Sequence, residues 1–310
     1  MNAPALTAPD LTTRSDRRAL LVLIAGAVAI GWSPILVRLG HTGPAATGFW
    51  RLAFALPWLG FLVARPGAAG DALGALKTPM IWLCALFFAL DLGFWHYGIH
   101  FTSVANATVL SNLTPILVTV FAWLVLKEAP KPLFLLGMAL AIAGAVGMAV
   151  FKGGVDGRPP SFLGDFLSVL TAVWYGAYFL VVRRVRETFS TAAVMWGTSL
   201  IGLAPLLLAA VLLREPLTPS TPGEWAALVA LGFVHVTGQG SIAWALGRLP
   251  TSLAAVVVLV QPVVAGLLGW WLFAEAMTPM QSACAALALA GVAVAQLSAR
   301  KPQPVEAPEA

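Results

Sequence analysis

The chain has 310 residues, of which 59% are hydrophobic and 10% are charged. A soluble domain averages roughly 45–50% apolar and about 25% charged residues, so this composition excludes a soluble enzyme, a secreted disulfide scaffold and a disordered chain. The formal net charge of +5 does not indicate a nucleic-acid partner, because the cations gather at the ends of long apolar stretches. Cys84 and Cys284 lie inside such stretches, so they predict neither a disulfide nor a metal site.

The apolar stretches are each about 20 residues long, the length that a helix needs to cross a bilayer. They predict an all-α integral membrane protein with ten spans. In chain order the spans are 19–39, 45–64, 78–99, 103–126, 132–150, 162–182, 190–213, 225–246, 250–273 and 279–297. The first span follows three arginines as a signal peptide would, but it continues to Arg38 and has a counterpart later in the chain. We therefore interpret it as a membrane helix.

Basic residues between the spans indicate the orientation. With the N-terminus in the cytoplasm, thirteen of the 18 Lys and Arg residues lie at cytoplasmic span ends and four lie at the opposite ends. Because cytoplasmic loops are enriched in Lys and Arg, we expect a multi-pass protein of the bacterial inner membrane with both termini in the cytoplasm. Residues 1–18 and 298–310 are expected to form cytoplasmic tails.

An internal repeat relates the two halves of the chain. A shift of 147 residues aligns 103–149 with 250–296 without a gap. The aligned pairs include Pro115 with Pro262, Trp123 with Trp270, Glu128 with Glu275, Pro132 with Pro279 and Gly144 with Gly291. Five spans per half is an odd number, so the second half enters the membrane from the opposite side. We expect a 5+5 inverted-topology repeat, with five-helix units at 19–150 and 162–297 joined by a periplasmic linker at 151–161.

Two stretches carry a family resemblance. The sequences LKEAPKPLFLLGMALAIAGAVGM and LFAEAMTPMQSACAALALAGVAVA resemble the paired signature of the drug/metabolite transporter superfamily, and more closely its ten-helix EamA-type exporter branch. Within that branch the chain resembles the YddG-type exporters of aromatic amino acids. The resemblance implies an exporter of small metabolites, with amino acids as the leading class, that works by alternating access around a central cavity. It implies no cofactor, no metal and no catalytic residue.

Two alternatives remain beside this interpretation. A membrane-embedded enzyme would need a nucleophile, a dyad or a metal site, and the sequence offers none with suitable spacing. A transporter of lipid-linked or nucleotide-sugar cargo would need several cations facing its cavity, and Arg51 is the one basic residue inside a span. The expected partners are a small-molecule substrate and the lipid bilayer. Small residues in the fifth and tenth spans allow close helix contacts within a monomer or a homodimer.

Two prolines mark candidate bends in the substrate path. Pro115 and Pro262 each remove a backbone donor and kink a helix, which frees carbonyls that need partners or a wet cavity in lipid. We expect these kinks to line the path beside Asn112 and Gln261, while a static kink relieved by packing is the alternative.

The eighth span carries a polar interruption, Gly238–Gln239–Gly240, beside His235. Two glycines weaken the helix and permit close approach, and Gln239 can both donate and accept hydrogen bonds to a zwitterionic or amide-like solute. Close helix packing with a hydrogen-bonded glutamine is the alternative interpretation.

Asp91 is a carboxylate near the middle of a span. A charge at this depth costs roughly 2.5–3.5 kcal/mol on insertion scales, so Asp91 is expected to face protein or water, or to be protonated. It is a candidate to bind a substrate ammonium or to carry a proton, and a structural ion pair with Arg51 is the alternative. His96 and His235 are candidates for proton coupling or for a hydrogen-bonded pocket wall.

Aromatic residues complete the candidate binding site. An apolar cavity with a few polar groups suits an aromatic or aliphatic metabolite, although tryptophan and tyrosine are also enriched at membrane interfaces. The aromatic candidates are Trp32, Trp95, Trp174, Tyr175 and Tyr178.

Overall fold

The computed structural model describes residues 14–65, 68–102, 104–114, 116–117, 131–151, 161–249, 254, 257–258, 260–273 and 278–298. Every regular element in these ranges is helical, which confirms the predicted all-α class. The elements are α1 (Arg14–Gly31), α2 (Ser33–Arg38), α3 (Pro44–Val63), α4 (Ala68–Leu76), α5 (Pro79–Phe101), α6 (Val104–Ser111), α8 (Pro132–Val150), α9 (Phe162–Val185), α10 (Thr191–Leu212), α11 (Pro222–Val234), the π-helical turn η1 (His235–Gln239), α12 (Gly240–Leu246), α14 (Val260–Phe273) and α15 (Pro279–Ser298).

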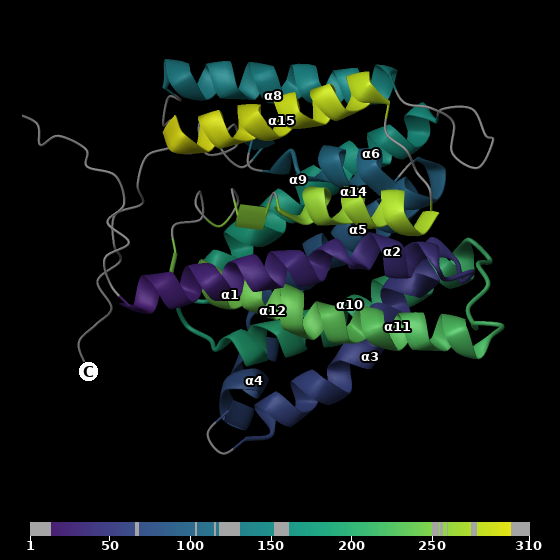
Figure 1. Cartoon of the computed structure of the whole chain (residues 1–310). Coiled ribbons are helices and arrows are strands. Elements are labelled where there is room, and N and C mark those ends of the chain that lie inside the picture. Colours follow the sequence, from purple (N-terminus) through teal and green to yellow (C-terminus); the bar gives the residue numbers. More distant parts are fainter. Residues whose placement is uncertain are drawn as a thin grey trace, which may run out of the picture.

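The long helices pack side by side as a bundle, and the start of α1 and the end of α15 lie at the same end of it (Figure 1). Six helices within the described ranges are long and apolar enough to cross a membrane: Arg17–Arg38, Pro44–Val63, Pro79–Phe101, Phe162–Val185, Thr191–Leu212 and Pro222–Leu246. The count of ten spans stays a prediction, because the expected fourth and ninth spans include residues outside the described ranges.

Several sequence expectations fall outside the described residues. Pro115, Trp123, Glu128 and Glu275 all do, as do most of the expected linker at 151–161 and of the two tails. Pro262 lies within α14, where the backbone is helical.

Local sequence explains how the first two helices are joined. Trp32 separates α1 from α2, and Pro34 stands at the start of α2, where a missing backbone N–H does no harm. After α2 the chain turns at Gly43, and α3 begins with Pro44.

The start of α3 is capped by a carboxylate from a distant loop. Arg214 adopts a left-handed backbone conformation, with φ of 53°, at the end of α10. The chain then brings Glu215 to the N-terminus of α3, where its carboxylate accepts the backbone N–H groups of Ala45 and Ala46 at 3.3 and 2.9 Å. A Cβ on Gly43 would lie 2.3 Å from this carboxylate, so only glycine permits the approach. The negative charge also complements the positive end of the helix dipole.

Helices α8 and α15 pack against each other through equivalent residues of the two repeats. A Cβ on Gly144 would lie 2.4 Å from the backbone nitrogen of Ala288 and 2.6 Å from the carbonyl oxygen of Cys284. A Cβ on Gly291 would lie 2.3 Å from the nitrogen of Ala141 and 2.7 Å from the carbonyl oxygen of Gly137. Since the repeat aligns Gly144 with Gly291 and Ala141 with Ala288, each helix gives the other the same contact, as a two-fold axis between two copies requires.

A buried polar network links the repeats near one end of the bundle. The Gln281 amide on α15 donates to Asn106 Oδ1 on α6 at 3.1 Å. Asn106 in turn donates to Asp165 Oδ1 on α9 at 3.3 Å, and the Thr102 hydroxyl donates to the same oxygen at 2.9 Å. These two hydrogen bonds hold Asp165 in the first turn of α9.

The short helix α4 follows the second span and is an element that the sequence analysis does not anticipate. Ala72 and Ala75 are buried and belong to an apolar cluster with Ile81, Ala193 and Val194. Asp71 accepts the backbone N–H of Ser190 at 2.8 Å, so α4 also braces the start of α10.

Candidate functional site

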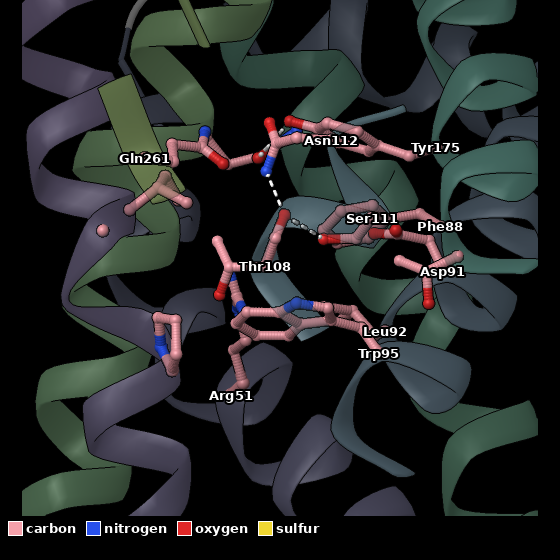
Figure 2. Close-up of a pocket in the computed structure, with 15 residues that line it drawn as sticks. Arg51, Phe88, Asp91, Leu92, Trp95, Thr108, Ser111, Asn112, Tyr175 and Gln261 are labelled. Carbon is pink, nitrogen blue, oxygen red and sulfur yellow. Dashed lines mark hydrogen bonds between the residues drawn. The ribbon is translucent and has the colours of Figure 1, made fainter. Parts of the chain in front are cut away.

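A central cavity lies between helices of both repeats (Figure 2). Its free volume of about 50 Å³ is room for a few water molecules, so a larger solute requires the walls to separate. The lining residues are Ile30, Gly31, Pro34, Arg51, Phe88, Asp91, Leu92, Trp95, Thr108, Ser111, Asn112, Thr171, Tyr175, Gln239 and Gln261. They come from α1, α2, α3, α5 and α6 in the first half of the chain and from α9, η1 and α14 in the second half.

Helix α5 supplies one continuous wall. Phe88, Asp91, Leu92 and Trp95 are spaced by three, one and three residues, which places all four side chains on one helix face. The wall is therefore mainly apolar, with a single carboxylate set among aromatic and aliphatic groups.

Two ionisable side chains of opposite sign, an arginine and an aspartate, line the cavity. Arg51 on α3 is 3% exposed and Asp91 on α5 is 7% exposed. The Arg51 guanidinium carbon lies 5.8 Å from the ring centroid of Trp95, a cation–π distance. The two charged side chains form no direct ion pair with each other, and the Arg51 Nε has no hydrogen-bond partner among the described residues. The structural Arg51–Asp91 ion pair that the sequence left open is thus not formed, although both groups line the same cavity.

Amide and hydroxyl groups line the opposite part of the cavity, where Figure 2 shows Asn112, Tyr175 and Gln261 close together. The Tyr175 hydroxyl donates to Gln239 Oε1 at 3.4 Å, and Asn112 Nδ2 donates to the Thr108 carbonyl at 2.8 Å. The Nε2 groups of Gln239 and Gln261 are buried and make no well-aligned hydrogen bond within the described structure, and they lie near the Tyr175 and Tyr178 hydroxyls. The cavity therefore offers unused N–H donors to a solute.

The predicted interruption of the eighth span is a π-helical turn. The backbone N–H of Gly240 bonds to the carbonyl of His235, five residues earlier, and such turns are frequent at functional sites. A Cβ on Gly238 would lie 2.6 Å from the Ile30 side chain and 3.1 Å from the Gly26 carbonyl, so this glycine lets η1 approach α1. Gly240 has no described atom within 4 Å of such a Cβ, and packing does not explain its identity.

Three aromatic candidates do not line the cavity. Trp32 is 41% exposed; its neighbours Gly31 and Pro34, three residues apart, face inward instead. Trp174 packs beside Phe87 and Phe94, with ring centroids 6.1 and 6.3 Å away. Tyr178 is buried behind the wall and packs on Phe88 at 4.7 Å.

The two candidate histidines also lie outside the cavity lining. His96 Nδ1 lies 3.1 Å from the Pro44 carbonyl oxygen and ties α5 to the start of α3. His235 Nε2 lies 3.1 Å from the Ser199 hydroxyl and ties η1 to α10. Both rings are thus positioned as supports between helices. In the described ranges, no three His, Cys, Asp or Glu residues gather as a metal site would require.

Of the predicted binding residues, six meet in one cavity: Asp91, Trp95, Asn112, Tyr175, Gln239 and Gln261. The cavity is also lined by Arg51 and by the hydroxyl residues Thr108, Ser111 and Thr171, which were not among the predicted binding residues. Polar spacing contained a signal for some of them. Thr108, Ser111 and Asn112 recur at three- and four-residue intervals, and Thr171 precedes Tyr175 by four, so each set shares one helix face.

Comparisons with known proteins agree with this architecture. The model of the EamA-like transporter family matches twice, at residues 17–150 and 162–296. The aromatic amino acid exporter YddG of Ancylobacter novellus is 27% identical over 294 residues, which cover 92% of this chain and 99% of that protein. The pseudopaline exporter CntI of Pseudomonas aeruginosa is 24% identical over 67% of this chain and 71% of its own length.

Two further comparisons point the same way. YetK of Bacillus subtilis, named an uncharacterized transporter, is 22% identical over 69% of this chain and 66% of its own length. A solved crystal structure superposes with a TM-score of 0.65 at 22% identity, covering 92% of this chain and 98% of that one, which shows a shared fold. The two matches to one family model account for the internal repeat. The chain is a membrane protein with two homologous repeats, and it belongs to the EamA-like transporter family.

Proposed function

We propose that this protein exports small metabolites from the bacterial cytoplasm, namely amino acids with aromatic or other apolar side chains. The observation that carries the proposal is the central cavity, where a mainly apolar wall that carries one carboxylate is combined with one arginine and the amide groups of two glutamines. An amino acid has the same combination of one apolar body and two opposite charges. The substrate class in the name of YddG is consistent with this proposal.

Transport by alternating access follows from the repeat. Two homologous halves that line one cavity can exchange conformations and so open that cavity to either face. The close contact between α8 and α15 is the same from both halves, so it is compatible with both states. The orientation proposed here, with both termini in the cytoplasm, rests on the distribution of Lys and Arg.

The test is counterflow of labelled amino acids into liposomes that contain the purified protein. Vesicles preloaded with unlabelled phenylalanine or leucine are expected to accumulate the labelled form above the level of protein-free vesicles. Matched vesicles with Phe88→Ala and Tyr175→Ala variants are expected to accumulate less, because both side chains line the cavity. Absence of counterflow for the whole set of apolar and aromatic amino acids would refute the proposed substrate class.

A further inference from the structure

The cavity contains an arginine and an aspartate that do not form a salt bridge with each other, and the packing of the helices does not explain why. Arg51 and Asp91 are both buried and face the same space, yet they form no direct ion pair. Charged groups inside a membrane protein are costly and are normally paired with each other or with a ligand. A cavity that keeps two opposite charges apart therefore suits a ligand that carries both complementary charges.

Arg51 is held in place without using its full capacity for hydrogen bonding. The guanidinium lies beside Trp95 at 5.8 Å, an interaction that fixes its position and leaves N–H groups for a ligand. Its Nε is buried and has no partner among the described residues. A planar guanidinium matches the geometry of a carboxylate and can bind it through two parallel hydrogen bonds.

We infer that the substrate is a zwitterion whose carboxylate binds Arg51 and whose ammonium group binds Asp91. This inference rests on the proposed function and narrows it to recognition of both charges at once. The apolar side chain of the substrate then lies against Phe88 and Leu92, on the wall that carries Asp91. Arg51 and Asp91 are specificity-determining residues, because a ligand with one charge leaves the other residue buried and unpaired.

The unpartnered amides of Gln239 and Gln261 are consistent with this arrangement. Both donate N–H groups from the opposite part of the cavity. These N–H groups can donate hydrogen bonds to oxygen atoms of a solute at a place in the cavity apart from the Arg51 guanidinium.

The experiment compares three solutes that share one aromatic body. Phenylalanine carries both charges, phenethylamine lacks the carboxylate, and 3-phenylpropanoate lacks the ammonium group. Each is tested in liposomes with the wild type, Asp91→Asn and Arg51→Gln. Control variants that remove the same charges outside the cavity are Asp71→Asn on α4 and Arg65→Gln beyond the end of α3.

The wild type is expected to transport phenylalanine at least about 30-fold more efficiently than either analogue, the ratio that loss of one buried charge partner produces. Asp91→Asn is expected to shift the preference toward 3-phenylpropanoate, and Arg51→Gln toward phenethylamine. The two control variants are expected to keep the wild-type ratios. Competition by the analogues against phenylalanine in the wild type gives the same preference without any variant, should a variant fail to fold.

The outcomes separate the two proposals. Equal transport of all three solutes by the wild type, or variants that lower all three in the same proportion, would overturn the zwitterion inference and leave the exporter function standing. Failure of the wild type to move any of the three solutes or any other apolar or aromatic amino acid would overturn the proposed substrate class and the inference with it.

Discussion

The close contact between α8 and α15 gives a quantitative prediction for Gly291. A Cβ at this position would lie 2.3 Å from the Ala141 backbone nitrogen, whereas real Cβ contacts essentially never fall under 3.0 Å. Gly291→Ala must therefore move the two helices apart by about 0.7 Å or more, because the opposing atom is backbone and cannot rotate away. Overpacking of this kind costs about 1–3 kcal/mol, and the melting temperature is expected to fall accordingly.

A matched control distinguishes this clash from the general effect of the substitution. A Cβ on Gly60 of α3 would have nothing within 4 Å, so Gly60→Ala is expected to leave stability unchanged or to raise it by up to about 1 kcal/mol. Thermal unfolding in detergent, followed by tryptophan fluorescence, measures both variants under one condition.

The equivalent position in the first repeat extends the test. A Cβ on Gly144 would lie 2.4 Å from the Ala288 nitrogen, so Gly144→Ala is expected to lower the melting temperature by a similar amount. The double variant is expected to fall short of the sum of both losses, because one separation of the helices relieves both clashes. If Gly291→Ala melted at the same temperature as Gly60→Ala, the two-fold contact between α8 and α15 would be refuted.

Three further predictions concern the cavity, the polar network and the orientation. Trp95→Ala is expected to lower the initial rate of transport in liposomes about tenfold, since it removes the aromatic partner of Arg51. Trp32→Ala is expected to keep the wild-type rate because Trp32 lies outside the cavity. Equal losses in both variants would contradict the placement of Trp95 in the cavity and Trp32 outside it. Gln281→Leu is expected to lower the free energy of unfolding by about 1–3 kcal/mol, because it removes the hydrogen bond from Gln281 to the buried Asn106 Oδ1. Ser282→Ala, at the exposed neighbouring position, is expected to leave the melting temperature unchanged in the same assay. Tags at the two termini are expected to be protected from protease in intact cells and cleaved after disruption; a tag on the opposite face from the other would contradict an even number of spans.

Hydropathy and spacing predict much of the fold because burial in lipid acts on composition directly. The expected span at 78–99 is the helix Pro79–Phe101, and the expected span at 190–213 is Thr191–Leu212. The helix α4 was missed because nine residues between two spans carry too little apolar pattern to separate a short buried helix from a loop.

The site was harder to predict because it depends on how each helix is rotated. Arg51 is a cavity residue that was not predicted, because an arginine near a span end is equally compatible with snorkelling toward the interface. Trp32 was predicted to line the cavity, because it lies deep in a span, and it does not. The bundle turns Arg51 inward and Trp32 outward. Asp91 and Gln239 were easier to identify, since strongly polar groups in mid-span have few places to go other than a cavity.

The π-helical turn η1 has a consequence for the geometry of the eighth span. A helix with one extra residue in a single turn changes its angular phase by about 100° from there on. The segment before η1 packs its Gly232 against Phe54 of α3, while the segment after it places Ile242 and Ala243 in the main apolar cluster. Deleting one residue from η1 would restore a regular α-helix. Either the contact of Gly232 with α3 or the packing of Ile242 and Ala243 in the apolar cluster would then be lost. The π-helical turn therefore rotates the second segment relative to the first, so that each segment packs against its own neighbour. Gln239, the last residue of the turn, lines the cavity.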